Sequence, residues 1–163
     1  MIPVYTSMNH DIVVVALGND FRGDDGAGVL FGRLLKEQGL FTVIEGGDAP
    51  ENMTGPIVGS RPEAIVIADA LDFGGKPGEF TFLPVEKLSG SGISTHSSLN
   101  LFVDYLKMMT GARIHIIGFQ PQHLGIGEGL TDAVRICVET TARAVLQSGG
   151  FECLYPNTQG ERT

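Results

Sequence analysis

The sequence is short of cysteine and of positive charge, and each shortage excludes a class of protein. Its 163 residues include two cysteines, Cys137 and Cys153, whose spacing matches no zinc-binding or redox motif. One pair would be a thin disulfide framework, so we expect a reducing compartment. Asp and Glu outnumber Lys and Arg by 19 to 11, giving a formal net charge of −8. Without a basic stripe, neither nucleic acid nor an anionic membrane surface is expected as a partner.

Long hydrophobic runs are also missing. The apolar run Ile12–Leu17 is far too short to span a bilayer, and no basic segment with a long apolar stretch precedes it. We therefore expect a cytoplasmic protein. Charged residues make up 18% and apolar residues 42% of the chain, a composition typical of a folded protein. We expect residues 1–163 to form one domain, with a core from about 11 to 150 and a loose tail over 151–163.

The chain does contain alternating strand and helix patterns. Ile12–Leu17 and Ala64–Ala68 are continuous apolar runs rich in β-branched residues, typical of strands buried on both faces of a parallel sheet. Further strands are predicted at 42–44, 80–85 and 114–119. Helices are predicted from 27 to a stop at Gly39, from about 97 to 110, and from a cap at Thr131 onward, with Cys137 on the apolar face of the last. Any helix within 49–59 is expected to be short.

The connection between the third and fourth strands settles the expected topology. Residues 69–79 are rich in Gly and Pro and too few for a helical crossover, so the fourth strand is predicted to be antiparallel and near an edge. The predicted fold class is α/β: a three-layer α/β/α sandwich with a mostly parallel twisted sheet of about five strands and one antiparallel edge strand. In such sheets ligands bind outside the carboxyl ends of the strands.

The first loop at that edge, residues 18–28, is acidic. It has neither the glycine spacing of a dinucleotide-binding loop nor a phosphate-binding lysine. Carboxylates at a helix N-terminus occupy its positive end and repel phosphate, so the loop suits a cation better than a nucleotide. Of the adjacent Asp24 and Asp25, one is expected to cap the helix, and Asp25 is the functional candidate.

Two further candidates follow later strands. Asp69 ends the third strand at the carboxyl edge; it could form a turn, although Asp72 could do that instead. His96 precedes a predicted helix that Thr95 or a neighbouring serine could cap, which would leave the imidazole free to face the cleft.

Two carboxylates and an imidazole, from Asp25, Asp69 and His96, make a plausible site for one divalent ion with open coordination positions. The remaining histidines are weaker candidates: His10, His115 and His123. A serine-hydrolase elbow motif is absent, and the predicted burial of Cys137 argues against a cysteine nucleophile.

Five segments, taken together, resemble the nickel-iron hydrogenase maturation endopeptidases. They are G-N-D-F-R-G-D-D-G-A-G from residue 18, G-G-D-A-P-E-N from 46, I-A-D-A from 67, S-T-H-S-S-L-N from 94, and G-F-Q-P from 118 followed by G-L-T-D-A-V. Each is weak alone, but their order and spacing are specific. The similarity runs from about Ile12 to Gly149, and the second and fourth segments look most like the formate-hydrogenlyase and energy-converting hydrogenase branch.

The resemblance implies an endopeptidase that removes the C-terminal extension of a hydrogenase large-subunit precursor after nickel insertion. It implies that Asp25, Asp69 and His96 form the metal-recognition and catalytic site, that the nickel is carried by the substrate, and that no organic cofactor is needed. Asp24, Asp48 and His123 are not implied as ligands. The alternative is a non-catalytic metal-binding or partner-binding module on the same fold.

Overall fold

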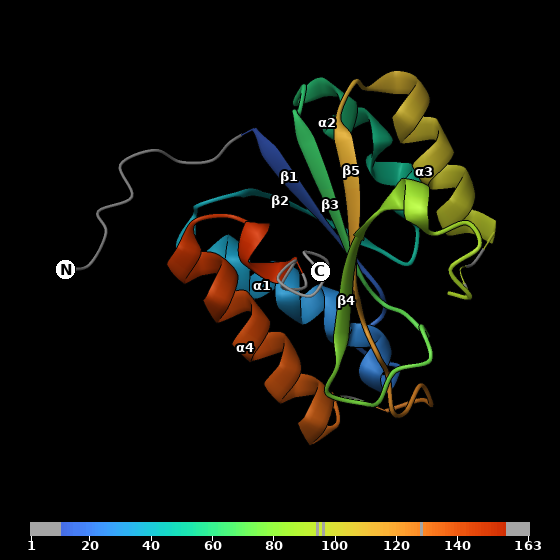
Figure 1. Ribbon diagram of the computed structural model, residues 1–163, viewed down its shortest axis with the longest axis vertical. Coiled ribbons are helices and arrows are strands. Elements are labelled where there is room, and N and C mark those ends of the chain that lie inside the picture. The colour runs from blue at the N-terminus through green and yellow to red at the C-terminus, as the bar shows by residue number, and fades with distance from the viewer. Residues whose placement is uncertain (1–10, 94, 96, 128, 156–163) are drawn as a thin grey trace, which may run out of the picture.

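A five-stranded sheet lies between two groups of helices in the computed structural model, which describes residues 11–155 except 94, 96 and 128 (Figure 1). The strand order is β2-β1-β3-β5-β4, with neighbours parallel except for β4, which runs antiparallel to β5 at one edge. The strand bounds are β1 Ile12–Leu17, β2 Thr42–Gly47, β3 Ala64–Ala70, β4 Phe80–Pro84 and β5 Arg113–Phe119. The predicted fold class and the antiparallel edge strand are confirmed.

Alternate side chains of the central strands enter two separate cores. Val14 and Val66 belong to the core beneath α1 (Ala27–Gln38) and α4 (Asp132–Ser148). Val13 and Ile65 belong to the core beneath α2 (Thr54–Gly59) and α3 (Ser97–Met109). Because both faces of these strands are covered, their sequences are continuously apolar. Cys137 lies in the first core, as predicted.

Helix α1 packs unusually close to the sheet. A Cβ added to Gly28 would lie 2.3 Å from the Ala68 carbonyl oxygen and 2.5 Å from that of Leu17. The helix therefore rests directly on the ends of β1 and β3, which holds the acidic loop at the carboxyl edge of the sheet. The helix ends at Gly39 in a left-handed conformation, as predicted.

Two strands run further than predicted. β2 continues to Gly47, whose carbonyl accepts a hydrogen bond from the Gly18 N–H at 2.8 Å. β3 continues to Ala70, so Asp69 lies within the strand, opposite Gly118 of β5, and does not follow its end. β1 supplies ladder partners for Glu45 and Gly47 of β2, and β5 supplies them for Asp69 and Ala70 of β3. Residues 50–59 form the 3₁₀ turn η2 (Pro50–Met53) and the short helix α2.

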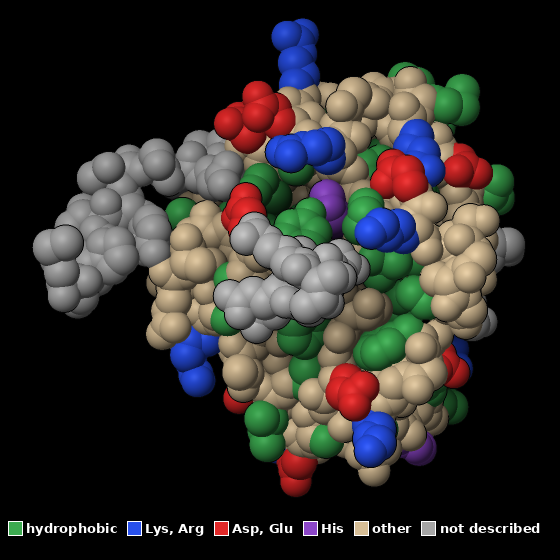
Figure 2. All heavy atoms as spheres, in the orientation of Figure 1, with side chains coloured by type: hydrophobic (Ala, Val, Ile, Leu, Met, Phe, Trp, Pro, Cys, Tyr) green, Lys and Arg blue, Asp and Glu red, His purple; other side chains and the backbone are tan. Residues whose placement is uncertain are grey.

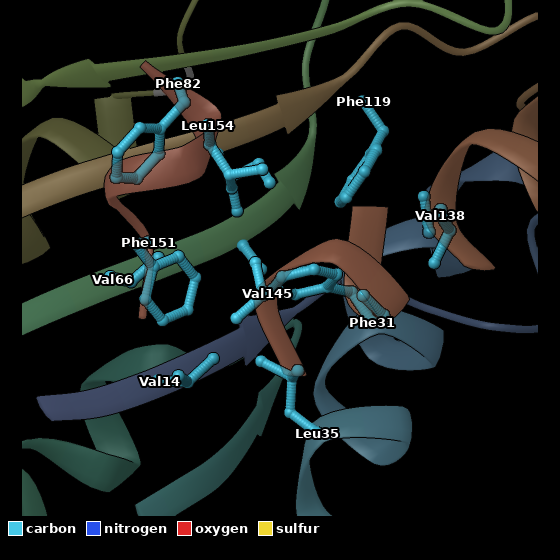
Figure 3. Close-up of a cluster of buried hydrophobic side chains, with 14 of the residues drawn as sticks. Val14, Phe31, Leu35, Val66, Phe82, Phe119, Val138, Val145, Phe151 and Leu154 are labelled. Carbon is cyan, nitrogen blue, oxygen red and sulfur yellow. The ribbon is translucent and has the colours of Figure 1, made fainter. Parts of the chain in front are cut away.

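The expected start of a loose tail at residue 151 is wrong. Phe151 and Leu154 are buried against the core beneath α1 and α4 (Figure 3). The Phe151 ring centroid lies 5.3 Å from that of Phe41 and 5.9 Å from that of Phe82. Apolar and aromatic burial therefore holds residues 151–155 on the domain, although the sequence shows no periodic pattern there. Residues 156–163 lie outside the described part of the chain.

On the face shown in Figure 2, the acidic and basic side chains of the described residues are interspersed. Among the described residues, no helix combines the length and apolar character needed to cross a membrane.

Candidate active site

A small cavity lies where the carboxyl ends of β1, β2 and β3 meet the start of α3. Its volume is about 140 Å³, and Asp25 and Asp69 both line it. The other lining residues come from the same strand ends and loops: Leu17, Gly18, Gly47, Asp48, Pro50, Ser98 and Leu99. The structure thus brings two of the three predicted site residues together. His96 lies outside the described residues, two positions before the lining residue Ser98.

Asp25 is held by a 3₁₀ turn, η1 (Gly23–Gly26), directly before α1. One of its carboxylate oxygens accepts a hydrogen bond from the Asn19 N–H at 3.0 Å. Gly18 fits between the two acids: a Cβ there would lie 2.0 Å from the Asp25 carbonyl oxygen and 3.7 Å from Oδ1 of Asp69. Its φ of +124° also disfavours any side chain. A side chain at position 18 would therefore collide with the backbone of Asp25.

Asp69 has a strongly perturbed acidity. Burial, and to a smaller extent the charge of Asp25, raise its pKa to about 7 against the opposing effect of a hydrogen bond from the Ala70 N–H. Near neutral pH the carboxyl is therefore protonated in a large fraction of molecules. A cation beside Asp25 and Asp69 would favour the ionised form and release that proton.

Asp24 has a different role from the one predicted. Its side chain is fully buried, and its carboxylate accepts hydrogen bonds from the backbone N–H groups of Gln122 (2.8 Å), His123 (2.9 Å) and Thr131 (2.7 Å) and from the Thr131 hydroxyl. Burial alone would raise the pKa of Asp24, but these bonds outweigh it and lower the pKa. The residue at the N-cap of α1 is Gly26, with no side-chain cap, so neither aspartate caps the helix.

These hydrogen bonds join two loops at the carboxyl edge of the sheet, and we call the set of bonds made by Asp24 the clamp. Asp24 ties the loop after β1 to the β5–α4 connection, and the Asp24 N–H donates to the His123 carbonyl at 2.8 Å. Thr131 stands at the N-cap of α4, as predicted, but its hydroxyl serves Asp24 rather than the helix. Sequence reasoning missed this clamp because its partners are far away along the chain.

The other acids and histidines considered from the sequence serve elsewhere. Asp72 forms the turn, accepting hydrogen bonds from the Gly74 N–H at 3.1 Å and Gln120 Nε2 at 3.2 Å. His115 lies in β5 with Nε2 2.6 Å from the Tyr155 hydroxyl. His123 does not line the cavity, and His10 lies outside the described residues.

The described residues alone do not complete a metal site. Within residues 11–155, leaving out 94, 96 and 128, no group of three or more His, Cys, Asp or Glu side chains is arranged to hold a metal ion. Asp25 and Asp69 provide two carboxylates, and Asp48 adds a third acid to the lining.

Comparison with known proteins identifies the class. The model of the HycI family of hydrogenase maturation proteases matches residues 30–148. The hydrogenase 3 maturation protease of Escherichia coli K12 is 36% identical over 132 residues, covering 78% of this chain and 84% of that protein. The crystal structure of the [NiFe] hydrogenase maturation protease HycI from Thermococcus kodakarensis KOD1 has a TM-score of 0.76 at 33% identity, covering 90% of this chain and 95% of that one. The solution structure of the endopeptidase HycI from Escherichia coli has a TM-score of 0.71 at 32% identity, covering 81% and 86%.

The α/β fold and these relatives together identify the protein as a hydrogenase maturation endopeptidase. The chain belongs to the HycI family of hydrogenase maturation proteases, which cleave the C-terminus of the hydrogenase large-subunit precursor. The resemblance drawn from five sequence segments is confirmed, and so is the expected formate-hydrogenlyase branch.

Proposed function

We propose that this protease cuts its precursor only after nickel has been inserted, and that Asp25, Asp69 and His96 recognise the nickel. The observation that supports this most directly is the shared cavity of Asp25 and Asp69, two acids that are distant in sequence. The segment before Ser98, which includes His96, adjoins that cavity along the chain.

The size and charge of the cavity suit a metal ion carried by the substrate. About 140 Å³ equals roughly five water molecules at liquid density, so little more than the metal and a few ligand atoms can enter. Two carboxylates in a partly dehydrated space repel each other, and a divalent ion removes that repulsion. An unloaded precursor would bring no positive charge and would leave the repulsion in place.

In this account the three side chains have separate roles. Asp25 and Asp69 supply negative charge, and His96 supplies a neutral nitrogen, the combination that borderline divalent ions accept. The nickel marks the precursor as loaded, and as a Lewis acid it can polarise the scissile carbonyl or a water molecule.

Replacement of His96 by Ala tests the proposal. Purified variant and parent protein are incubated with a nickel-loaded precursor, and the large subunit is weighed by mass spectrometry. We expect the parent to shorten the subunit and the variant to leave it intact, with the circular dichroism spectrum unchanged. Undiminished cleavage by the variant would remove His96 from the site, and no shortening by the parent would favour the non-catalytic binding module.

A further inference from the structure

Helix α3 exposes an apolar stripe beside the candidate active site. Leu101, Tyr105 and Met108 are 71%, 41% and 82% exposed, and their spacing of four and three residues puts them on one side of the helix. The opposite side of α3 is in the core, through Phe102 and Leu106 among others. Apolar side chains exposed together on one side of a helix are candidates for an interaction surface.

A groove accompanies this stripe. It has a volume of about 500 Å³ and lies between α3 and the η2–α2 segment, lined by Glu51, Thr54, Ser98, Leu101, Phe102 and Tyr105. That volume is within the range of ligand-binding clefts. Ser98 lines both this groove and the cavity of Asp25 and Asp69. The groove is therefore continuous with the candidate active site at the start of α3.

Another hollow near the same edge lacks this continuity. It has a volume of about 430 Å³ and is lined by Phe21, Arg33 and Arg135 among others, but it shares no lining residue with the cavity. Arg33 there is already paired with Asp20 and Glu45. A chain leaving the cavity would reach the α3 groove first.

We propose that the groove along α3 binds the C-terminal extension of the hydrogenase precursor, that is, the residues that follow the cleaved bond. This inference rests on the proposed function, which places the nickel-bearing part of the precursor at the cavity. That part precedes the cut, and the cavity is too small to hold the residues that follow it. The extension must therefore leave across the adjoining surface.

The dimensions and chemistry of the groove fit such a segment. The exposed stripe, which starts at the groove residue Leu101 and continues beyond the groove to Met108, is about 10 Å long along the helix axis, the length of about three residues of extended chain. Apolar side chains of the extension would pack on Leu101 and Tyr105, while Glu51 at the rim favours a positive charge over a negative one.

Replacing Leu101 by Glu tests the groove with little risk to folding, because the side chain is exposed. Ile136→Glu is the matched control, since Ile136 is 60% exposed on α4, across the sheet. With the nickel-loaded precursor we expect Leu101→Glu to raise KM about tenfold or more and to leave kcat within about twofold. The control should leave both unchanged. Equal KM values for the two variants would overturn the proposal.

Crosslinking identifies what binds in the groove along α3, and it does so without requiring cleavage. p-Benzoylphenylalanine introduced at position 105 is irradiated in the presence of the nickel-loaded precursor or of the mature large subunit, and adducts are mapped by mass spectrometry. We expect adducts within the extension of the precursor and none with the mature subunit. Adducts with a second copy of the protease, with the body of the large subunit, or with nothing would each overturn the inference. If the parent protein cuts nickel-free and nickel-loaded precursor equally but the extension still crosslinks, the proposed function fails and the groove assignment stands.

Discussion

Asp25 and Asp69 line one cavity at the carboxyl edge of the sheet, with the backbone of Gly18 packed against both. Burial and the charge of Asp25 together raise the pKa of Asp69 to about 7. Two acids in this relationship are unfavourable as a pair of free anions and favourable as ligands to a cation. The proposed nickel recognition therefore assigns this pair as the acids that would hold the ion.

Replacing either acid of this pair by its amide should abolish processing. We expect Asp25→Asn and Asp69→Asn each to slow cleavage of a nickel-loaded precursor by about 10²-fold or more, the size of effect seen when one electrostatic partner of a reacting centre is removed. Cleavage is followed by mass spectrometry under single-turnover conditions. Asp48→Asn is the matched control because Asp48 lines the same cavity but is not assigned as a ligand. An equal loss of cleavage rate in all three variants would mean that only the total negative charge of the cavity matters, and would contradict a specific role for Asp25 and Asp69.

Asp24 should matter for stability. Asp24→Asn replaces one buried acceptor oxygen by a donor, which then faces either the N–H groups of Gln122 and His123 or the N–H of Thr131. We expect a loss of about 2–4 kcal/mol in the free energy of unfolding, measured in urea. Asp20→Asn, which removes an exposed ion pair with Arg33, should cost about 1 kcal/mol or less. Similar losses in the two variants would contradict the clamp.

The close approach of α1 to the sheet predicts a strong effect of one added methyl group. Gly28→Ala would push a Cβ into the carbonyl oxygens of Leu17 and Ala68, so we expect destabilisation of about 3 kcal/mol or more. In Gly55→Ala, a substitution in α2 directly before Pro56, the new methyl group meets nothing within 4 Å apart from its chain neighbours, and we expect a change of about 1 kcal/mol or less. Thermal unfolding measures both. A neutral Gly28→Ala would show that α1 can move away from the strands without loss.

His115 predicts a specific dependence of stability on pH. Burial and then the charge of Arg113 lower its pKa, against a smaller opposing effect of Glu86. The unfolded chain therefore binds the proton more readily, and the stabilisation present above the unfolded pKa of about 6.5 is lost as pH falls. Between pH 7 and 5.5 we expect the parent protein to lose more unfolding free energy than His115→Gln. Asp69, whose raised pKa gives the opposite slope, is present in both proteins and cancels in the comparison. Equal slopes would contradict the assignment.

Local patterns were sufficient to predict the sheet and the meeting of two site residues. The β-branched runs at 12–17 and 64–68 mark strands covered on both faces, and the short Gly-rich and Pro-rich connection after β3 indicates that β4, which pairs with β5 at the edge, is antiparallel. Because parallel strands end at one edge, the rule for ligand sites in such sheets brought Asp25 and Asp69 together without knowledge of the strand order.

Contacts between distant segments could not be predicted in this way. Asp24 and Asp25 are indistinguishable in sequence, and only the proximity of Gln122 and Thr131 makes one a buried clamp and the other a cavity acid. The burial of Phe151 likewise depends on aromatic partners from three other segments of the chain.

The most direct test of nickel recognition is to offer the parent protein two otherwise identical precursors, one loaded with nickel and one free of it, and to follow the mass of the large subunit with time. The account predicts that only the loaded precursor is shortened, and that this shortening is lost in His96→Ala and Asp25→Asn. Equal shortening of the two precursors by the parent protein would contradict it.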